Sequence, residues 1–405
     1  MNVTTRSNTR NALLAAFLGW TFDAFDFFIL TFVVSQVARD FGKPIQSIAF
    51  TLTASLLMRP VGAVLFGLMA DRWGRRIPLM LNIVFYSIME MLSGFAPSYK
   101  IFLTLRLLYG IGMGGTWGVG ASLAMESAPA KSRGILSGIL QEGYALGYLL
   151  AAIAFWTVFP RWGWRPMFFI AVAPALLTLL ILSRVQESEA WKASAPQKKS
   201  WKEYFVLFGA NWQRFLYLVA LMAIMNFSSH GTQDLFPTFL QLQHHFSTRA
   251  TAIITVISMM GAIAGGIVVG ALSDRFGRRR AMVTSMLMAL LLVPLWVFMP
   301  KMALIAMGAF LMQFMVQGAW GVIPAHINEL SPGPLRGFFP GFAYQVGVLI
   351  AASAPYIESL MTHHLSYAQS MGIFAASVFA VGAIVIAPGP EAHRVAFRGD
   401  SPEKN

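Results

Sequence analysis

Long apolar segments separated by short polar ones fill almost the whole sequence. A membrane-spanning helix needs about 20 consecutive, mostly apolar residues. Twelve segments come close to that length or exceed it, and they lie at 12–38, 46–70, 77–95, 99–123, 135–159, 166–183, 214–240, 248–271, 281–299, 302–326, 337–361 and 367–387. The pattern predicts an all-α integral membrane protein with twelve transmembrane helices.

Composition supports this prediction. Of the 405 residues 57% are hydrophobic and only 12% are charged, whereas a soluble domain is about half apolar and about a quarter charged. Only about ten residues precede the first apolar segment and no small-residue cleavage site follows them, so we expect a retained anchor and not a removable signal peptide. The chain has no cysteine, which excludes disulfides, thiolate metal sites and cysteine catalysis.

The net charge of +13 is distributed unevenly over the predicted loops. With the N-terminus inside, the inner segments carry 21 of the 30 Lys and Arg residues and the outer loops carry seven. Because basic residues in short loops stay on the cytoplasmic side, this bias predicts that both termini are cytoplasmic. The charge therefore gives no indication of nucleic-acid binding. Short loops and the absence of an organellar signal favour a cell inner (plasma) membrane.

The sequence repeats itself at an offset of 203 positions. The segment GLMADRWGRR at 67–76 returns as GALSDRFGRR at 270–279, and Trp117 returns as Trp320. Such a parallel repeat predicts two six-helix bundles related by an axis along the membrane normal. The predicted divisions are an N-terminal bundle at 1–183, a cytoplasmic linker with one amphipathic turn at 184–213, a C-terminal bundle at 214–387 and a polar, disordered cytoplasmic tail at 388–405.

The repeated Gly-x3-Asp-Arg-x-Gly-Arg-Arg turn and the RLLYGIGMGG run at 106–115 resemble the major facilitator superfamily. The resemblance covers the whole chain and implies two bundles that rock about a central site. The structural alternative for this turn is that its arginines only set the membrane topology and its glycine only bends the chain. Glu126–Arg133 also repeats as Glu329–Arg336, which favours a gate. The predicted gating residues are Asp71, Arg72, Arg75, Glu126, Arg133, Asp274, Arg275, Arg278, Glu329 and Arg336.

The predicted seventh helix contains the most informative polar segment, NFSSHGTQDLFPT at 226–238. At about 100° per residue, one face carries Asn226, His230, Gln233 and Asp234. Pro237 would break the helix beside that face, because proline cannot donate the helical hydrogen bond. A buried hydrogen-bond network between helices is the structural alternative. A titratable His–Asp pair favours a transport site instead, since histidine changes charge near neutral pH.

The segment Asn-x-x-Ser-His-x-Thr-Gln-Asp-x-x-x-Thr resembles the Jen-type lactate/pyruvate–proton symporters, within the sialate:proton symporter family. The segments LQEGYALGY at 140–148 and YQVG at 344–347 look like the same group. The resemblance implies that Asn226, His230 and Asp234 serve substrate recognition and proton coupling. The predicted substrate-binding residues are Arg59, Asn226, His230, Gln233, Tyr344 and Gln345.

Charged residues inside a span are costly and need a reason. Arg59 is the candidate to bind an anion, because arginine stays protonated and can clasp a carboxylate with two hydrogen bonds. Its alternative is a structural pair with Asp23 or Asp26. Glu90 and Glu358 are expected to reach the membrane interface. The predicted proton-coupling residues are Asp23, Asp26, Arg106, Glu142, His230 and Asp234.

These residues predict a secondary transporter that moves small monocarboxylates of the lactate or pyruvate type with protons by alternating access. The alternatives are a proton symporter for sialic acid or another organic acid, a drug exporter, or a transporter-like sensor. The expected partners are a small organic anion, protons and the lipid bilayer, and we expect a monomer. Neither a His-Glu-x-x-His nor a Gly-x-Ser-x-Gly motif occurs. We therefore expect no enzyme, no cofactor and no metal site.

Overall fold

The computed structural model describes residues 3–170, 172–194, 201–393, 395 and 397, and these residues form helices with no strand. The first half comprises α1 (Val3–Asp40), α2 (Ile45–Trp73), α3 (Arg76–Phe95), α4 (Tyr99–Ser127), the 3₁₀ turn η1 (Ala130–Ser132), α5 (Arg133–Gln141), α6 (Gly143–Thr157), α7 (Phe159–Trp162), α8 (Arg165–Ile170) and α9 (Val172–Ser183). Two short helices, α10 (Glu189–Ser194) and α11 (Trp201–Ala210), lie between the halves in sequence.

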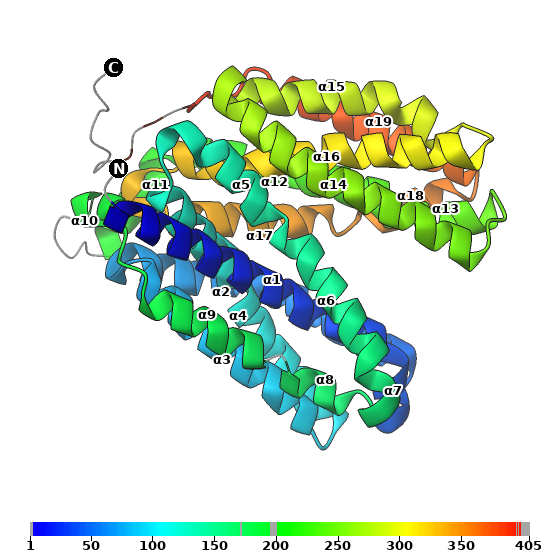
Figure 1. The fold of residues 1–405 in the computed structure, drawn as a ribbon, viewed down its shortest axis with the longest axis horizontal. Helices are drawn as coiled ribbons and strands as arrows, with labels where there is room; N and C mark the ends of the chain where they lie inside the picture. The colour runs from blue at the N-terminus through cyan, green and yellow to red at the C-terminus, as the bar shows by residue number, and fades with distance from the viewer. Residues whose placement is uncertain (1–2, 171, 195–200, 394, 396, 398–405) are drawn as a thin grey trace.

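The second half repeats this order. It comprises α12 (Trp212–Gln233), α13 (Phe236–Leu242), α14 (Thr248–Phe276), α15 (Arg278–Val297), α16 (Met302–Leu330), the 3₁₀ turn η2 (Gly333–Leu335), α17 (Phe339–Ala351), α18 (Ala354–Met361) and α19 (Tyr367–Ile386). The two bundles meet at the end of the molecule that carries both termini and diverge toward the other end (Figure 1). Contacts between them join α2, α4 and α5 to α14, α16 and α17.

Nine of the described helical segments are long and apolar enough to cross a bilayer on their own. The other three predicted spans fall on α4, on α8 with α9, and on α17 with α18. The helix α4 is 29 residues long, α17 and α18 are separate helices shorter than 18 residues, and the described parts of the sixth predicted span are α8 and α9, on either side of residue 171. The predicted α-helical membrane fold is therefore present.

Glycines bring α2 and α4 into backbone contact. A Cβ at Gly62 would overlap the carbonyl of Ile111, and a Cβ at Gly114 would overlap the carbonyl of Arg59. Only glycine tolerates so close an approach between two helices. This packing holds the backbone of Arg59 against α4. The helix that carries Arg59, α2, also contacts α17 of the second half.

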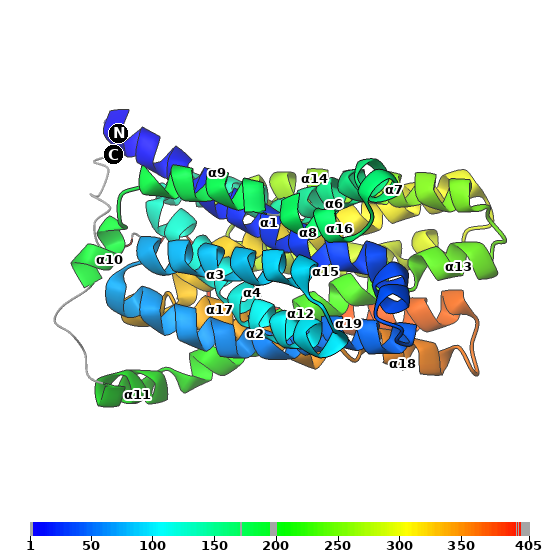
Figure 2. The same ribbon diagram turned by 90° about the horizontal axis from the view of Figure 1, so that it is seen from below.

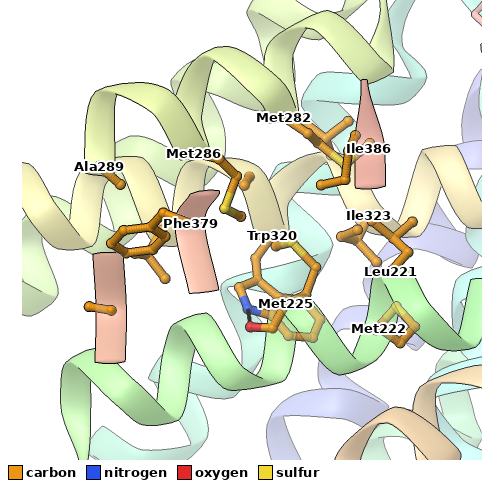
Figure 3. Packing of buried hydrophobic residues seen from close by; sticks show 14 of the residues in the cluster. Leu221, Met222, Met225, Met282, Met286, Ala289, Trp320, Ile323, Phe379 and Ile386 are labelled. Carbon is orange, nitrogen blue, oxygen red and sulfur yellow. Dashed lines mark hydrogen bonds between the residues drawn. The ribbon is translucent and has the colours of Figure 1, made fainter. Parts of the chain in front are cut away.

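The second half has a core rich in methionine. Figure 3 shows Met225 of α12 beside Trp320 of α16, with Met282 and Met286 of α15 nearby. The indole Nε1 of Trp320 donates a hydrogen bond to the carbonyl of Met225 at 3.1 Å. Flexible methionine side chains fill the irregular space between helices, so the core fixes Trp320 where it reaches the contact between the halves.

The prediction of a disordered tail is wrong for its described residues. The backbone N–H groups of Arg278 and Arg279 donate to Glu391 at 3.1 and 3.0 Å, and His393 bonds the carbonyl of Asp274 at 2.8 Å. Polar composition suggested disorder, but these partners belong to a turn more than 100 residues away in sequence. The rest of the tail, apart from residues 395 and 397, lies outside the described residues.

The described part of the linker before residue 195 contacts the first half. Glu187 accepts hydrogen bonds from the backbone N–H groups of Arg75 and Arg76 at 2.9 and 3.1 Å, as Glu391 does in the second half. The single amphipathic turn expected near residue 201 is the ten-residue helix α11. Seen from below, α11 lies at the end that carries the termini (Figure 2), and the ring centroid of its Phe208 lies 5.8 Å from that of Phe339 on α17.

Candidate functional site

Arg59 lies on α2 where the two halves meet. Its side chain is buried, with 4% exposed, and its guanidinium lies 5.6 Å from the ring centroid of Tyr344 on α17. Its Nε and Nη2 atoms have no hydrogen-bond partner among the described residues. A buried cation with free N–H groups is costly unless an anion completes it. The arrangement is therefore suited to a carboxylate.

Aromatic rings from both halves surround Tyr344. Its ring centroid lies 4.6 Å from that of Trp117, 6.3 Å from that of Trp20 and 6.0 Å from that of Trp320. Trp320 also donates to the hydroxyl of Ser229 at 2.7 Å, next to the predicted polar face of α12. The neighbouring Gln345 is buried and donates to the carbonyl of Gly114 at 3.4 Å. The rings thus connect Arg59 to α12.

The polar face of α12 ends at the predicted break, because α12 stops at Gln233 and α13 begins at Phe236. The Nδ1 atom of His230 lies 3.0 Å from Oδ2 of Asp234, and these side chains are 38% and 33% exposed. A proton donor or substrate can therefore reach the pair from outside.

The two amides of the predicted site point elsewhere. Asn226 is buried and donates to the carbonyl of Met222 within its own helix at 2.7 Å. Gln233 donates to Gln313 of α16 at 2.8 Å. Both bonds are the kind expected of the structural alternative, in which amides hold membrane helices together. In this state neither amide nitrogen lies free beside Arg59.

The acids of α1 form a buried cluster with charged residues of α3 and α4. Asp23 and Asp26 are fully buried, and neither oxygen of Asp26 has a partner among the described residues. Asp23 interacts electrostatically with Arg59, but no direct ion pair joins them in the described part of the chain. Thr116 donates to Asp23 at 3.5 Å.

The expectation that Glu90 reaches the membrane interface is wrong. Glu90 is fully buried and forms an ion pair with Arg106. The guanidinium of Arg106 also lies 4.0 Å from the ring centroid of Tyr109. The position of Glu90 near the end of its predicted span suggested that it reaches the interface. In the structure Arg106 of the neighbouring helix α4 is its buried partner. Arg106 therefore has a structural role that competes with the role predicted for it in proton coupling.

The expectation that Glu358 reaches the membrane interface is also wrong. It is fully buried on α18 and contacts α12 rather than the interface. Glu142, between α5 and α6, behaves differently: its Oε1 faces Gly266 of α14, in the other half, and has no partner among the described side chains. Two protonatable groups thus lie where helices meet: among the described residues neither oxygen of Glu358 has a hydrogen-bond partner, and Oε1 of Glu142 has none.

The predicted gating residues gather at the end that carries the termini. We call the eight that contact one another the terminal clasp: Asp71, Arg75, Glu126, Arg133, Asp274, Arg278, Glu329 and Arg336. The backbone N–H groups of Gly337 and Phe338 donate to Asp71 at 2.6 and 3.1 Å. Those of Gly134 and Ile135 donate to Asp274 at 2.8 and 3.0 Å. Each aspartate therefore binds the opposite half.

Ion pairs complete the terminal clasp. Within the halves, Arg75 pairs with Glu126 at 2.9 Å and Arg278 with Glu329 at 3.0 Å. Between the halves, Arg133 pairs with Glu329 at 3.2 Å and Arg336 with Glu126 at 3.4 Å. Burial disfavours the charged form of Arg75, but the carboxylates of Glu126 and Asp71 outweigh burial and raise its pKa.

Two predicted members lie outside the terminal clasp. Arg72 and Arg275 occupy equivalent positions beside the clasp aspartates, and both side chains are exposed. The repeat motif predicts that Arg72 and Arg275 lie at the turn, but it does not predict the direction of their side chains. The clasp therefore uses the second arginine of each turn, Arg75 and Arg278, and leaves the first in solvent.

The tail also takes part in this cluster, and its participation was not predicted. Arg133 donates to the carbonyl of Val395 at 2.8 Å. The ring centroid of Phe397 lies 4.0 Å from the guanidinium carbon of Arg133 and 3.9 Å from that of Arg336. One arginine comes from each half, so Phe397 bridges them. The one signal was an isolated phenylalanine in a polar tail.

Comparison with known proteins gives a consistent result. The family model of the Major Facilitator Superfamily matches residues 16–268 and 235–403. A carboxylic acid transporter protein homolog of Saccharomyces cerevisiae is 30% identical over 91% of this chain, which spans 66% of that protein. A probable 4-methylmuconolactone transporter of Cupriavidus pinatubonensis is 29% identical, covering 92% and 89% of the two chains.

Two further comparisons concern a bacterial relative and a solved structure. The sialic acid transporter NanX of Escherichia coli is 29% identical, with 91% of each chain covered. The solved structure of the proton:xylose symporter XylE bound to 6-bromo-6-deoxy-D-glucose superimposes with a TM-score of 0.76. It is 18% identical, covering 97% of this chain and 98% of that chain, so it supports the fold alone.

Proposed function

Because the chain belongs to the major facilitator superfamily of multi-pass membrane transporters, we propose that it carries a small organic acid together with protons. The observation that supports this most is Arg59, a buried guanidinium with unpartnered N–H groups where the two halves meet. Within the organic acids, the α12 motif favours lactate- or pyruvate-type monocarboxylates. Sialic acid is the second candidate, since NanX is among the relatives.

Substrate binding follows from the chemistry of Arg59. Two parallel N–H···O bonds from Nε and Nη2 would hold one carboxylate, and the ring of Tyr344 covers the guanidinium at 5.6 Å. Tyr344 belongs to the second half and Arg59 to the first, so a bound acid contacts both bundles. A shared ligand of this kind couples binding to the rocking of the halves.

Proton coupling is assigned to His230 and Asp234, with Asp23, Asp26 and Glu142 as additional acids. The His230 and Asp234 side chains lie 3.0 Å apart and are 38% and 33% exposed, so a proton can reach the pair from the solvent. An anion and a proton cross as a neutral package, which lowers the electrostatic cost of moving through a low-dielectric barrier. Proton uptake therefore favours loading of the acid.

We assign the end that carries the termini to the cytoplasm, on the basis of the distribution of basic loops. The terminal clasp then closes the cytoplasmic side in this state, and its rupture opens the site inward. The protein would act as a monomer in the lipid bilayer of a cell inner membrane. Alternating access requires the ion pairs between the halves to break and form again in each cycle.

An uptake panel tests the proposed function. Purified protein in proteoliposomes is given labelled lactate, pyruvate, sialate and muconate, with and without an inward acid gradient. With a pH step of one unit, one coupled proton supports accumulation of about tenfold, because one unit corresponds to about 1.4 kcal/mol. Gradient-driven accumulation of a monocarboxylate is expected. If no organic acid accumulates, the proposed function is wrong.

Removal of the Phe397 ring is expected to loosen the clasp. Ser137 is fully buried between the halves and accepts a hydrogen bond from the backbone N–H of Ala325 at 3.0 Å. The chain has no cysteine, so Ser137→Cys introduces a single thiol there. In Phe397→Ala, loss of two cation–π contacts of about 0.5–1 kcal/mol each should increase maleimide labelling of that thiol several-fold. Unchanged labelling would show that the tail does not stabilise the closed state.

A further inference from the structure

The most unusual carboxyl outside the residues already assigned is Glu358 on α18. Its side chain is fully buried, and neither carboxyl oxygen has a hydrogen-bond partner among the described residues. Burying an ionised carboxylate without any donor costs so much that such groups take up a proton instead. The Glu358 carboxyl is therefore expected to be neutral in this state, holding a proton inside the second half.

Glu358 packs against the helical turn of α12 that precedes Asp234 and contains His230. A Cβ built on Gly231 would lie 3.6 Å from Oε1 of Glu358, and Gly231 follows His230 directly. The Asp234 carboxylate acts on Glu358 electrostatically. The same Cβ would overlap the ring of Phe374 on α19. The absence of a side chain at Gly231 thus lets α18 and α19 pack closely on the helical turn that carries the His–Asp pair.

The groups that face Glu358 come from the two helices packed against α18, which are α12 and α19. At the end of α12 near Gly231 the titratable groups are His230 and the C-cap residue Asp234, whereas Arg214 and Tyr217 lie in the first turns of α12. In α19 the only titratable residue is Tyr367, at its first position, and it is far along the helix from Phe374. No arginine or lysine follows Arg214 in α12, and α19 contains none, so neither helix places a basic side chain near Gly231 to neutralise a charge on Glu358.

From this arrangement we propose that Glu358 is a second proton-binding site of the C-terminal half, loaded through the exposed His230–Asp234 pair. The step is a single proton transfer: an O–H bond forms on the Glu358 carboxylate as the N–H bond of the His230 imidazolium, or the O–H bond of protonated Asp234, breaks. The net charge does not change in the transfer. The inference rests on the proposed function, to which it adds a buried proton store.

The difference in exposure gives the two sites different tasks. His230 and Asp234 are about one-third exposed and can exchange protons with the solvent. Glu358 is sealed by α12 and α19, so it holds its proton until α18 moves relative to α12. The interruption between α17 and α18, at Ala352 and Ser353, provides a point at which α18 can move separately.

The test compares Glu358→Gln with wild type in proteoliposomes. Glutamine keeps the size and the neutral state but cannot release a proton. The rate at which labelled acid exchanges for unlabelled acid without a gradient should stay within about twofold of wild type. The limiting accumulation of the acid should fall below that of wild type by about tenfold for each pH unit of gradient, which is the contribution of one coupled proton. Glu358→Asp should recover part of the loss. The proposal is overturned if Glu358→Gln accumulates acid as wild type does.

A second measurement does not depend on substrate. Infrared difference spectra of the purified protein should contain a protonated carboxyl band that is absent from Glu358→Gln. If wild type accumulates no organic acid, the proposed function fails, while the infrared band still tests Glu358. If the band is present unchanged in Glu358→Gln, the buried proton is not on this residue and the inference is wrong.

Discussion

Arg59→Gln is expected to abolish uptake while leaving the amount of folded protein in the membrane unchanged. Hydrogen bonds to charged groups contribute about 1.5–3 kcal/mol each, so loss of the two from Nε and Nη2 should weaken binding by at least about 100-fold. The fold should tolerate the change, because Arg59 makes no ion pair among the described residues and glutamine leaves no uncompensated charge. Initial uptake rates and equilibrium binding of the labelled acid measure the effect.

Arg59→Lys is the matched control for charge. Lysine keeps the positive charge but lacks the planar fork that binds a carboxylate with two parallel bonds. We expect an intermediate loss, larger in affinity than in maximal rate. A monodisperse size-exclusion profile for each variant excludes misfolding. If Arg59→Gln takes up the acid at the wild-type rate, Arg59 does not bind the anion and the proposed binding site is wrong.

Several features of the site could be predicted because they depend on local sequence. The spacing of His230 and Asp234 places them one turn apart on α12, and the structure has them 3.0 Å apart. Pro237 predicted the break between α12 and α13. The repeat at 203 positions anticipated the equivalent partners of Asp71 and Asp274, since identical motifs in related halves make equivalent contacts.

Other features depend on which helices become neighbours, and sequence position alone does not give that. Glu90 and Glu358 were assigned to the interface because of their positions along predicted spans, whereas packing on α4 and on α12 buries them. Phe397 stacks on arginines about 60 and 260 positions away in sequence. Asn226 lies on the predicted polar face but its amide bonds its own helix, since a face does not define a rotamer.

The double variant Asp71→Asn with Asp274→Asn is expected to shift the protein toward the state that is open at the terminal end. Each aspartate accepts two backbone N–H groups from the opposite half and pairs with an arginine of its own. Hydrogen bonds to a charged group contribute about 1.5–3 kcal/mol each, and the four backbone N–H bonds that cross between the halves exist only in the closed state. The open state should therefore gain at least about 100-fold in relative population.

Labelling of the single thiol in Ser137→Cys measures this shift, because that position is buried only while the clasp is closed. The labelling rate should rise by roughly two orders of magnitude in proportion to the open population, and acid-driven accumulation should be lost because one side no longer closes. Arg72→Gln with Arg275→Gln is the control, since it removes two charges from the same turns where both side chains are exposed. Labelling that is equal in both double variants would mean that the aspartates do not hold the halves together, and that the closed state depends on other contacts between α2, α5, α14 and α17.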